Sequence, residues 1–258
     1  MSRTSIKYKF DNGRGQKLAG IIDMPAGTPD FFGVFGPCFT CPKESHAAAK
    51  VCRHMADNGV AMLRIDVTGQ GESEGVFATE NFTTRVQDIV AASAALARDY
   101  QAPKLLVGHS ISGTASLAAV KSLPEIQAVA TIGSPRDPAS IIEKFRRQNL
   151  ITDKGGDDME ILVINHRVAF KKSFIDDMLA QHVAEDTAAI DRKLFVFHAP
   201  HDTIVTVDNA QDIYDRAVSA DRELIMLDAA ATHLFENRKE DAAYVADTLL
   251  DWFRTHLK

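Results

Sequence analysis

The sequence predicts an α/β fold in which a mostly parallel sheet of eight strands carries helices on both faces. Short apolar or β-branched runs alternate with longer helical patterns along almost the whole chain. Several of these runs are apolar throughout, as expected for strands that helices cover on both sides of the sheet. Two early strands with a short connection predict an antiparallel start, before the strand–helix repeats begin.

Each predicted strand is a short run of apolar or β-branched residues. The eight runs lie at Ile6–Phe10, Leu18–Met24, Phe31–Phe35, Val60–Ile65, Lys104–Val107, Ala128–Ile132, Leu194–Phe197 and Leu224–Leu227. Helical patterns lie between or after the later runs, at Ser45–Asp57, Phe82–Asp99, Thr114–Ser122, Val207–Ala217 and Asp241–His256. A strand, a helix and a further strand in this order form the unit that builds a parallel sheet.

The composition fits a single globular domain that spans residues 1–258. The chain is 45% hydrophobic and 25% charged, which is enough for a sizeable core. Its 29 Lys and Arg against 35 Asp and Glu give a formal charge of -6, and no basic block offers a site for nucleic acid or anionic lipid. The first ten residues lack the apolar run of a secretion signal, and the apolar stretch 104–120 is broken by polar residues and glycine. We therefore expect neither export nor a membrane span.

The loop after the third predicted strand contains two of the three cysteines, in the sequence Cys38-Phe39-Thr40-Cys41. So few cysteines do not make a disulfide framework, and we expect a protein of the reducing cytoplasm. A zinc site would need two further ligands, and the sequence has no second cysteine pair. A thioredoxin-like redox pair would need a different order of elements around it. We therefore expect Cys38 and Cys41 to be thiols that line a substrate pocket, with a redox-sensitive pair as the alternative and with no metal.

A glycine-rich segment, DVTGQGESEG, covers Asp66–Gly75. Its glycines follow the pattern G-x-G-x-x-x-G, which departs from the dinucleotide fingerprint, and a loop rather than a helix follows it. We predict a turn near the site that is held by side-chain bonds from Asp66 and Ser73. No cofactor is predicted.

The strongest motif is the apolar strand that begins at Lys104 and leads directly into GHSISG at residues 108–113. A helix of small residues follows, which gives the strand–turn–helix context of a nucleophile elbow. The residues two before and two after the nucleophile must be small, and Gly108 and Ser112 occupy these positions around Ser110. Ser112 stands where glycine is usual. The helix N-terminus supplies free N–H groups for a developing negative charge, so we predict that Ser110 is a catalytic nucleophile.

Residues 135–190 interrupt the alternation of strands and helices. The segment carries helical and polar stretches, with short strand patterns around a Gly-Gly turn, where one crossover helix would suffice. We predict a lid over the site, because insertions of this size in compact folds tend to carry function. Its apolar residues include Phe174 and Met178, which we expect to line the substrate pocket opposite Cys38 and Cys41. A homodimer contact through the same apolar residues is the alternative.

A serine nucleophile needs a base, and the base needs an acid that orients it. In the strand–turn–helix architecture the chain order is serine, acid, histidine. Asp202 lies just beyond a buried strand, at the edge of the sheet where sites form in open α/β folds. We predict that Asp202 is the acid, although an aspartate there can also cap the following helix. Asp228, at the end of the next strand, is the reserve candidate.

The predicted base is His233, which lies in the loop after the last strand and ahead of the final helix. His198 and His201 are of the right type, but they lie on the loop of the proposed acid. His201 is the immediate neighbour of Asp202, so its ring is poorly placed to join the acid to the serine. We expect His109, next to the nucleophile, to pack beneath the elbow.

A negatively charged oxygen that forms during acyl transfer needs hydrogen-bond donors. One donor should be the backbone N–H of Ile111, directly after the nucleophile, and the second should come from the loop after the third strand. Phe39 is the best candidate for the second donor. Its neighbour Pro37 has no N–H, and Cys38 lies one residue nearer the strand.

These motifs together resemble the α/β-hydrolase superfamily, over nearly the whole chain: GHSISG, DVTGQGESEG, HAPHD and the late His233. More narrowly, CFTCPKESHAAAKV, FATENFTTRVQDIVAA and AVATIGSPRDPA resemble the hydrolase half of bacterial proteins that join such a domain to an OsmC-like domain. The resemblance implies Ser110 as nucleophile, Asp202 as acid and His233 as base, with an oxyanion loop at residues 38–39. Many relatives carry His-Gly or His-Cys where this chain has Pro37 and Cys38.

We therefore expect a carboxylic-ester hydrolase that acts on small-molecule esters with small to medium acyl or aryl groups, without cofactor or metal. Thioesterases, amidases or peptidases, and carbon–carbon bond hydrolases use the same three residues, and the sequence leaves these alternatives open. A non-catalytic binding homologue is the rival from another class, but a binding module would not need all three residues. Nucleic acid and membrane are not expected partners.

Overall fold

The computed structural model describes residues 2–163, 166–235 and 238–256. In chain order the strands are β1 (Thr4–Asp11), β2 (Lys17–Met24), β3 (Phe32–Gly36), β4 (Ala61–Ile65), β5 (Leu105–His109), β6 (Ala128–Ile132), β7 (Ile151–Gly155), β8 (Asp158–Val163), β9 (His166–Lys171), β10 (Lys193–His198) and β11 (Arg222–Met226). The α-helices are α1 (His46–Asp57), α2 (Phe82–Asp99), α3 (Ile111–Ala119), α4 (Pro138–Arg147), α5 (Lys172–Ala180), α6 (Val183–Ala188), α7 (Asp208–Arg216) and α8 (Lys239–His256).

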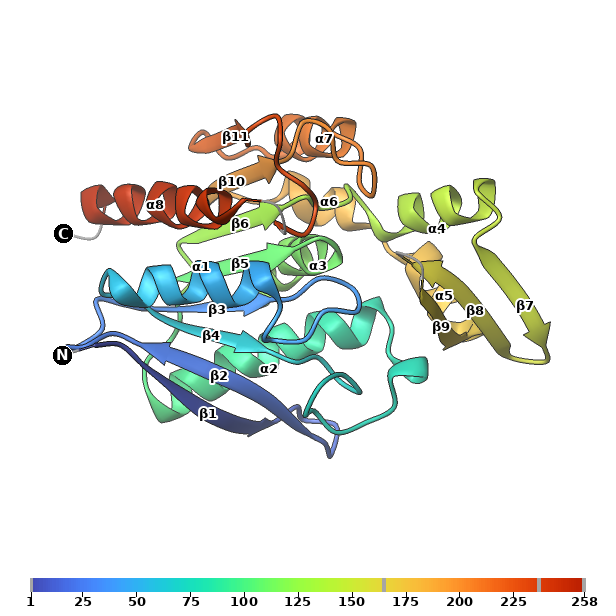
Figure 1. Cartoon of the computed structure of the whole chain (residues 1–258), viewed down its shortest axis with the longest axis horizontal. Helices are drawn as coiled ribbons and strands as arrows, with labels where there is room; N and C mark the ends of the chain where they lie inside the picture. Colours follow the sequence, from blue (N-terminus) through green and yellow to red (C-terminus); the bar gives the residue numbers. More distant parts are fainter. Residues whose placement is uncertain (1, 164–165, 236–237, 257–258) are drawn as a thin grey trace.

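The main sheet has eight strands in the order β1-β2-β4-β3-β5-β6-β10-β11. β2 is antiparallel to both of its neighbours, β1 and β4. Every other pair of neighbouring strands is parallel. Figure 1 shows the resulting twisted sheet with helices in front of it and behind it. The fold class that the sequence predicts, including the antiparallel start, is confirmed.

The two faces of the sheet have separate hydrophobic cores. α1 and α8 lie on one face, in a cluster of buried residues that also contains Phe195 and Phe197 of β10. α2, α3 and α7 lie on the other face, in a cluster that also contains Leu194 and Val196 of the same strand. Successive strand residues point to opposite faces, so a strand covered on both sides must be apolar throughout. This is why β10 has no polar alternation.

The segment between β6 and β10 carries several elements of its own and packs on the main domain. α4 leads into a three-stranded antiparallel sheet, β7-β8-β9, and α5 and α6 follow. Figure 1 shows α4, α5 and this small sheet beyond the edge at which the parallel strands end. α6 returns the chain to the main sheet and packs on α3 and α7. These elements correspond to the insertion at 135–190 that the sequence singles out.

Local signals explain where several helices begin. Asn81 caps α2 in a capping box, because its side chain accepts from the Thr84 N–H while the Thr84 hydroxyl accepts from the Asn81 N–H. Asp137 caps α4 by accepting from the N–H of Ser140, and Pro138 stands at the first helical position. α3 begins at Ile111, three residues earlier than the sequence predicts. Within the described ranges, no helix is long and apolar enough to cross a bilayer.

Candidate active site

Ser110 lies between β5 and α3, in a turn whose backbone conformation is strained. Its φ is 56° and its ψ is -129°, a region that residues with a side chain rarely adopt. The Ser110 N–H donates to the Ile132 carbonyl at 2.8 Å, which ties the turn to β6. A Cβ on Gly108 would lie 2.3 Å from the Ser112 carbonyl oxygen, so only glycine fits there. The turn presents a serine at the carboxyl edge of the sheet, as the motif predicts.

Asp202 and His233 come together from the loops that follow β10 and β11. His233 Nδ1 lies 2.5 Å from Asp202 Oδ2, and both side chains are buried. The other carboxylate oxygen, Oδ1, accepts from the N–H groups of Ile204 and Val205 at 2.8 and 2.9 Å. These bonds use both oxygens of Asp202 and fix the orientation of the His233 ring.

The electrostatics of Asp202 favour its charged form. Burial acts to raise the pKa of Asp202, but the hydrogen bond and charge of His233 and the two amide donors oppose it. Their combined effect holds the pKa of Asp202 below its ordinary value. Asp202 is therefore a carboxylate at neutral pH, and it can stabilise a positive charge on the His233 ring.

Two further histidines lie behind this pair. Burial lowers the pKa of His109 to about 3, and burial also lowers the pKa of His198. His198 Nε2 donates to the Val205 carbonyl at 2.9 Å, and so supports the loop that carries Asp202. Both rings are neutral and fully buried. They pack and donate hydrogen bonds, as expected for His109.

Ser110 and His233 line the same cavity. Because Asp202 occupies Nδ1, the nitrogen that His233 leaves for a reacting group is Nε2. Among the described residues no hydrogen bond joins the Ser110 hydroxyl to this ring. Such bonds are often long in an enzyme without substrate and shorten in the reacting complex.

Two residues that line the cavity have backbone N–H groups without an acceptor among the described residues. Ile111 is the first residue of α3, so its N–H has no partner within the helix. Phe39, in the loop after β3, likewise donates to none of the described residues. Both residues line the cavity with Ser110. The arrangement can accept a negatively charged oxygen.

The cavity is almost entirely apolar. The loops after β3, β5, β10 and β11 contribute Cys38, Phe39, Thr40, Ser110, Ile111, Ile204, Val205, His233 and Leu234. The segment after β6 contributes Pro135, Ile141, Ile142, Phe145, Val163, Phe174 and Met178. Of the four residues expected to line a substrate pocket, Cys38, Phe174 and Met178 line this cavity. Cys41 is not among the lining residues.

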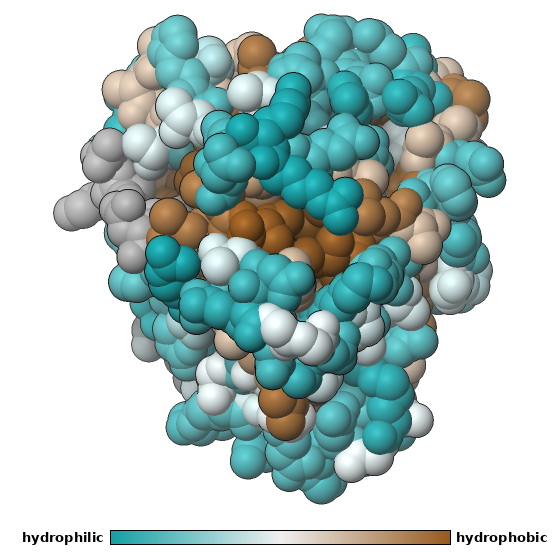
Figure 2. Space-filling view, turned by 90° about the vertical axis from the view of Figure 1, so that its right-hand side faces the viewer, coloured by the Kyte–Doolittle hydropathy of each residue, from teal (hydrophilic) through white to brown (hydrophobic). Residues whose placement is uncertain are grey.

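Aromatic rings join the insertion to the loop after β3. The Phe39 ring stacks on Phe170 at 5.3 Å between centroids, and Phe170 stacks on Phe174 at 4.4 Å. Figure 2 views the molecule from the side on which the insertion lies, and shows a hollowed band of hydrophobic side chains between hydrophilic margins. The ring contacts pack the insertion against the loop after β3.

The expectation of two free thiols in the loop after β3 is wrong: a disulfide joins Cys38 to Cys41. The spacing of the pair places their Cα atoms 5.1 Å apart, which is within the range that a disulfide can bridge. Cys52, the third cysteine, is free and buried in α1. No group of three or more His, Cys, Asp or Glu residues in the described ranges is placed to hold a metal ion.

The glycine-rich segment forms the predicted turn. The Ser73 hydroxyl donates to the Asp66 carbonyl, and Asp66 Oδ2 accepts from the Glu72 N–H. Asp66 also accepts from the backbone N–H and from Nζ of Lys43, both at 2.7 Å. Lys43 lies in the loop between β3 and α1, so the turn supports that loop.

The remaining candidates lie away from the cavity. Asp228, the reserve acid, is exposed and pairs with Arg238 at 3.1 Å. His201 is also exposed. The structure therefore brings Asp202 to His233 and leaves Asp228 outside.

Sequence reasoning missed three side chains that hold the loop after β3: Gln70, Arg85 and the hydroxyl of Ser112. Ser112 stood out only as a departure from glycine. Arg85 carried no signal, because a buried arginine on a helix looks like an exposed one in sequence. Buried polar partners become visible only when the elements are packed together.

Comparisons with known proteins agree with the fold. A family model described as "Serine aminopeptidase, S33" matches residues 42–150. The chain is similar to the esterase domain of a Rhodothermus marinus protein, whose crystal structure is known. The two sequences are 32% identical, the match covers 98% of each chain, and the TM-score is 0.79. None of the curated protein sequences matches this chain significantly.

Two more distant structures share the fold. Est1E from Butyrivibrio proteoclasticus, solved with ferulic acid bound, is 20% identical, covers 95% of this chain and 98% of its own, and has a TM-score of 0.80. The esterase Pf2001 from Pyrococcus furiosus is 18% identical, covers 96% of this chain and 90% of its own, and has a TM-score of 0.70.

Proposed function

The chain belongs to the α/β-hydrolase superfamily, and on that premise we propose that it is a serine hydrolase that cleaves carboxylic esters through an acyl-enzyme on Ser110. Its substrates are small-molecule esters with small to medium acyl or aryl groups. The single observation that carries the proposal is the hydrogen bond of 2.5 Å between Asp202 Oδ2 and His233 Nδ1. His233 lines the same cavity as Ser110, which lies in a strained turn.

The proposed reaction has two halves. Ser110 Oγ attacks the ester carbonyl carbon while His233 Nε2 takes the hydroxyl proton, and the carbonyl oxygen becomes an oxyanion that accepts from the N–H groups of Ile111 and Phe39. His233 then gives its proton to the departing alkoxide, which leaves as an alcohol. A water molecule attacks the acyl-enzyme in the same way, with His233 as base, and releases the acid and free Ser110.

Asp202 keeps the proton on His233 Nδ1 and balances the charge that the ring gains in each half. The two amide donors to its other oxygen keep it ionised. Loss of this carboxylate would leave the ring free to adopt the wrong tautomer.

The lining of the cavity supports an ester of an apolar acid. None of its described lining residues is Asp, Glu, Lys or Arg. An aminopeptidase would need an anionic group to bind the substrate ammonium, and no carboxylate lines the described part of the cavity. The esterase domain at 32% identity and the ferulic acid bound to Est1E agree with an acyl or aryl group.

Within the superfamily, we place the chain beside the hydrolase half of α/β-hydrolase/OsmC-like fusion proteins. The support is the resemblance of the loop after β3, of the start of α2 and of the segment after β6. We also propose that residues 135–190 act as a lid, because the insertion supplies the apolar wall that faces Ser110.

A hydrolysis panel tests the proposal. p-Nitrophenyl esters of increasing chain length are compared with matched thioesters and anilides, and the protein is treated with a fluorophosphonate that labels activated serines. We expect ester hydrolysis that favours short to medium chains, with the label on Ser110. A protein that is folded but unlabelled and inactive would be a binding homologue. Faster turnover of thioesters or anilides would identify one of the rival activities.

A further inference from the structure

The loop between β3 and α1 carries the proposed oxyanion donor Phe39, and side chains from other elements hold its backbone. The Pro37 carbonyl accepts from Arg85 Nη1 at 3.3 Å and from Ser112 Oγ at 2.5 Å. The Phe39 carbonyl accepts from Arg85 Nη2 at 3.1 Å and from Gln70 Nε2 at 2.5 Å. The two carbonyls lie on either side of the peptide that joins residues 38 and 39.

That central peptide is fixed as a consequence. Its own carbonyl, on Cys38, accepts from the Cys41 N–H at 3.3 Å, and Arg85 holds the carbonyls before and after it. Because a peptide group is planar, a fixed carbonyl direction also fixes the direction of the Phe39 N–H. These hydrogen bonds therefore orient the Phe39 N–H, and none of the described residues accepts a hydrogen bond from it.

Arg85 reaches both sides of the proposed oxyanion hole. Its Nη1 also donates to Ser112 Oγ at 2.9 Å, and Ser112 is the neighbour of Ile111 in the first turn of α3. Ser112 thus accepts from Arg85 and donates to Pro37. The pair joins the helix that supplies one N–H to the loop that supplies the other. The exposed fractions of Arg85 and Ser112 are 2% and 0%, and hydrogen bonds to a charged group are strong when they are buried.

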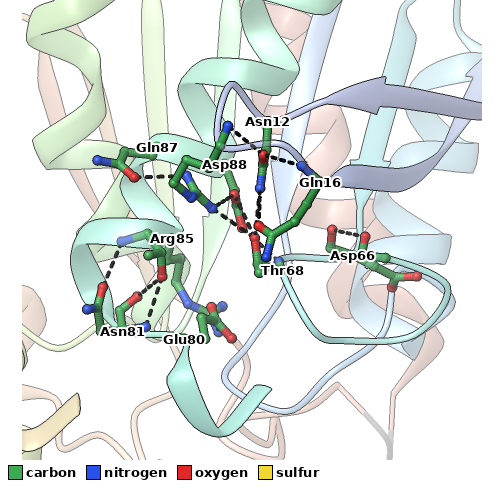
Figure 3. Close-up of polar contacts among 12 residues, drawn as sticks. Asn12, Gln16, Asp66, Thr68, Glu80, Asn81, Arg85, Gln87 and Asp88 are labelled. Atoms are coloured by element: carbon green, nitrogen blue, oxygen red, sulfur yellow. Dashed lines mark hydrogen bonds and ion pairs between the residues drawn. The ribbon is translucent and has the colours of Figure 1, made fainter. Parts of the chain in front are cut away.

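Neighbouring residues favour these hydrogen bonds. A glycine at position 112 has no hydroxyl and could not form them. Gly36 leaves space for the Ser112 side chain, because a Cβ on Gly36 would lie 2.9 Å from Ser112 Cβ. Glu80 faces the guanidinium, with Oε1 at 2.9 Å from Arg85 Nη2. Figure 3 shows Glu80, Asn81 and Arg85 at the start of α2, with a separate polar cluster around Asp88.

We propose that Arg85 and Ser112 are positioning residues that hold the Phe39 and Ile111 N–H groups at the separation an oxyanion needs. Neither residue is among those that line the cavity in the described ranges, so both act through the backbone of Phe39 and the start of α3. The inference rests on the proposed function, because it assigns these N–H groups to an oxyanion.

The experiment compares Arg85→Met, Arg85→Lys and Ser112→Ala with the wild-type protein. A misplaced donor weakens transition-state binding more than substrate binding, so kcat should fall while KM stays within about twofold. We expect kcat to fall by about 100-fold in Arg85→Met, by less in Arg85→Lys and by about 10-fold in Ser112→Ala, since removal of a whole oxyanion donor costs about 10²–10³. The rate of fluorophosphonate labelling should fall in parallel.

Arg14→Met is the matched control. Arg14 pairs at 2.6 Å with Asp88, which lies on α2 as Arg85 does, and among the described residues no hydrogen bond or ion pair joins Arg14 to the loop after β3. This variant should lose some thermal stability and keep its kcat. If Arg85→Met does not fold, Ser112→Ala decides, because it removes only a hydroxyl.

The outcomes separate the two proposals. If Ser110→Ala is inactive but folded Arg85 and Ser112 variants keep kcat and labelling within about threefold of wild type, the positioning role is overturned and the function stands. A loss of kcat that Arg14→Met shares equally also overturns the positioning role. If the wild-type protein is neither active nor labelled, or if Ser110→Ala stays active, the proposed function fails and the positioning role fails with it.

Discussion

His109 Nε2 donates a hydrogen bond of 2.7 Å to the backbone carbonyl of His233. The donor precedes Ser110 at the end of β5, and the acceptor lies in the loop after β11, so the bond ties the proposed nucleophile to the proposed base. Because burial lowers the pKa of His109 to about 3, its ring is neutral at working pH. A carbonyl accepts only from a protonated nitrogen, so the proton of His109 must be on Nε2.

We predict that His109→Phe lowers kcat by about 10-fold with little change in KM, because the His233 carbonyl then loses its donor in a buried site. A phenyl ring keeps the stacking on Phe235, which isolates the effect of the hydrogen bond. Steady-state kinetics on a p-nitrophenyl ester measure it. His54→Phe, on the distant helix α1, is the control. Equal kcat in both variants would show that His233 needs no support from His109.

Ser110→Ala and His233→Ala should each lose several orders of magnitude in kcat while they still fold, because catalysis needs both groups at once. Asp202→Asn should be less severe, since the ring loses only its orientation and charge balance. Asp228→Asn is the matched control for the acid and should retain full activity, as Asp228 is exposed and pairs with Arg238. A larger loss in Asp228→Asn than in Asp202→Asn would assign the acid role to Asp228.

The disulfide between Cys38 and Cys41 predicts a simple labelling pattern. Protein denatured without a reductant should gain one carbamidomethyl group from iodoacetamide, on Cys52, because only Cys52 is a free thiol. After reduction, denatured protein should gain three. Intact-mass spectrometry measures this difference of two carbamidomethyl groups between the unreduced and the reduced protein. Three groups without a reductant would mean that the loop after β3 carries free thiols in solution.

Glu80 should make the protein less stable as the pH rises. Burial raises the pKa of Glu80 from its ordinary 4.5 to about 8, with Arg85 acting against this shift. Because the folded chain holds this proton more tightly than the unfolded chain, its contribution is full below about pH 4.5 and is lost as the pH rises through about 8.

The test is the Tm difference between wild type and Glu80→Gln, which should fall by about 5 °C between pH 5 and pH 8.5. The control is Glu72→Gln. Hydrogen bonds and charge from Lys43 and Lys7 lower the pKa of Glu72 to about 2, so its contribution is constant over this range. A Tm difference for Glu80→Gln that is flat across the range would show that the Glu80 carboxyl keeps its ordinary affinity for protons.

The main sheet could be predicted because its strands are buried on both faces. All eight predicted runs form strands of the sheet, with ends that differ by at most two residues from the predicted ones. The small sheet of the insertion has a weaker pattern. β7 reads Ile-Thr-Asp-Lys-Gly and none of its side chains is fully buried, so no apolar run or alternation marks it.

The candidate site was likewise predictable from the sequence only in part. Asp202 and His233 were predictable as neighbours, because both follow parallel strands whose ends meet at one edge. The bonds from Arg85 to the loop after β3 were not, since they join residues 46 and 48 positions apart through side chains. The disulfide was not predicted because three cysteines are too few for a disulfide framework, and a redox-sensitive pair was kept only as the alternative.

The last prediction concerns the proposed lid. Phe174 and Met178 project from α5 into the cavity that holds Ser110, whereas Leu179 of the same helix is not among the lining residues. Removing a wall enlarges an apolar pocket, so Phe174→Ala and Met178→Ala should shift kcat/KM toward longer acyl chains. Leu179→Ala removes a similar side chain and should leave the chain-length preference unchanged.

A homodimer contact through the insertion is the competing explanation for its apolar residues, and light scattering distinguishes the two. A lid wall predicts a changed preference at constant molar mass. A dimer contact predicts a concentration-dependent loss of molar mass with the chain-length preference intact. That second result would remove the lid from the proposal. The proposed roles of Ser110, Asp202 and His233 would remain, since they depend on the loops at the sheet edge rather than on α5.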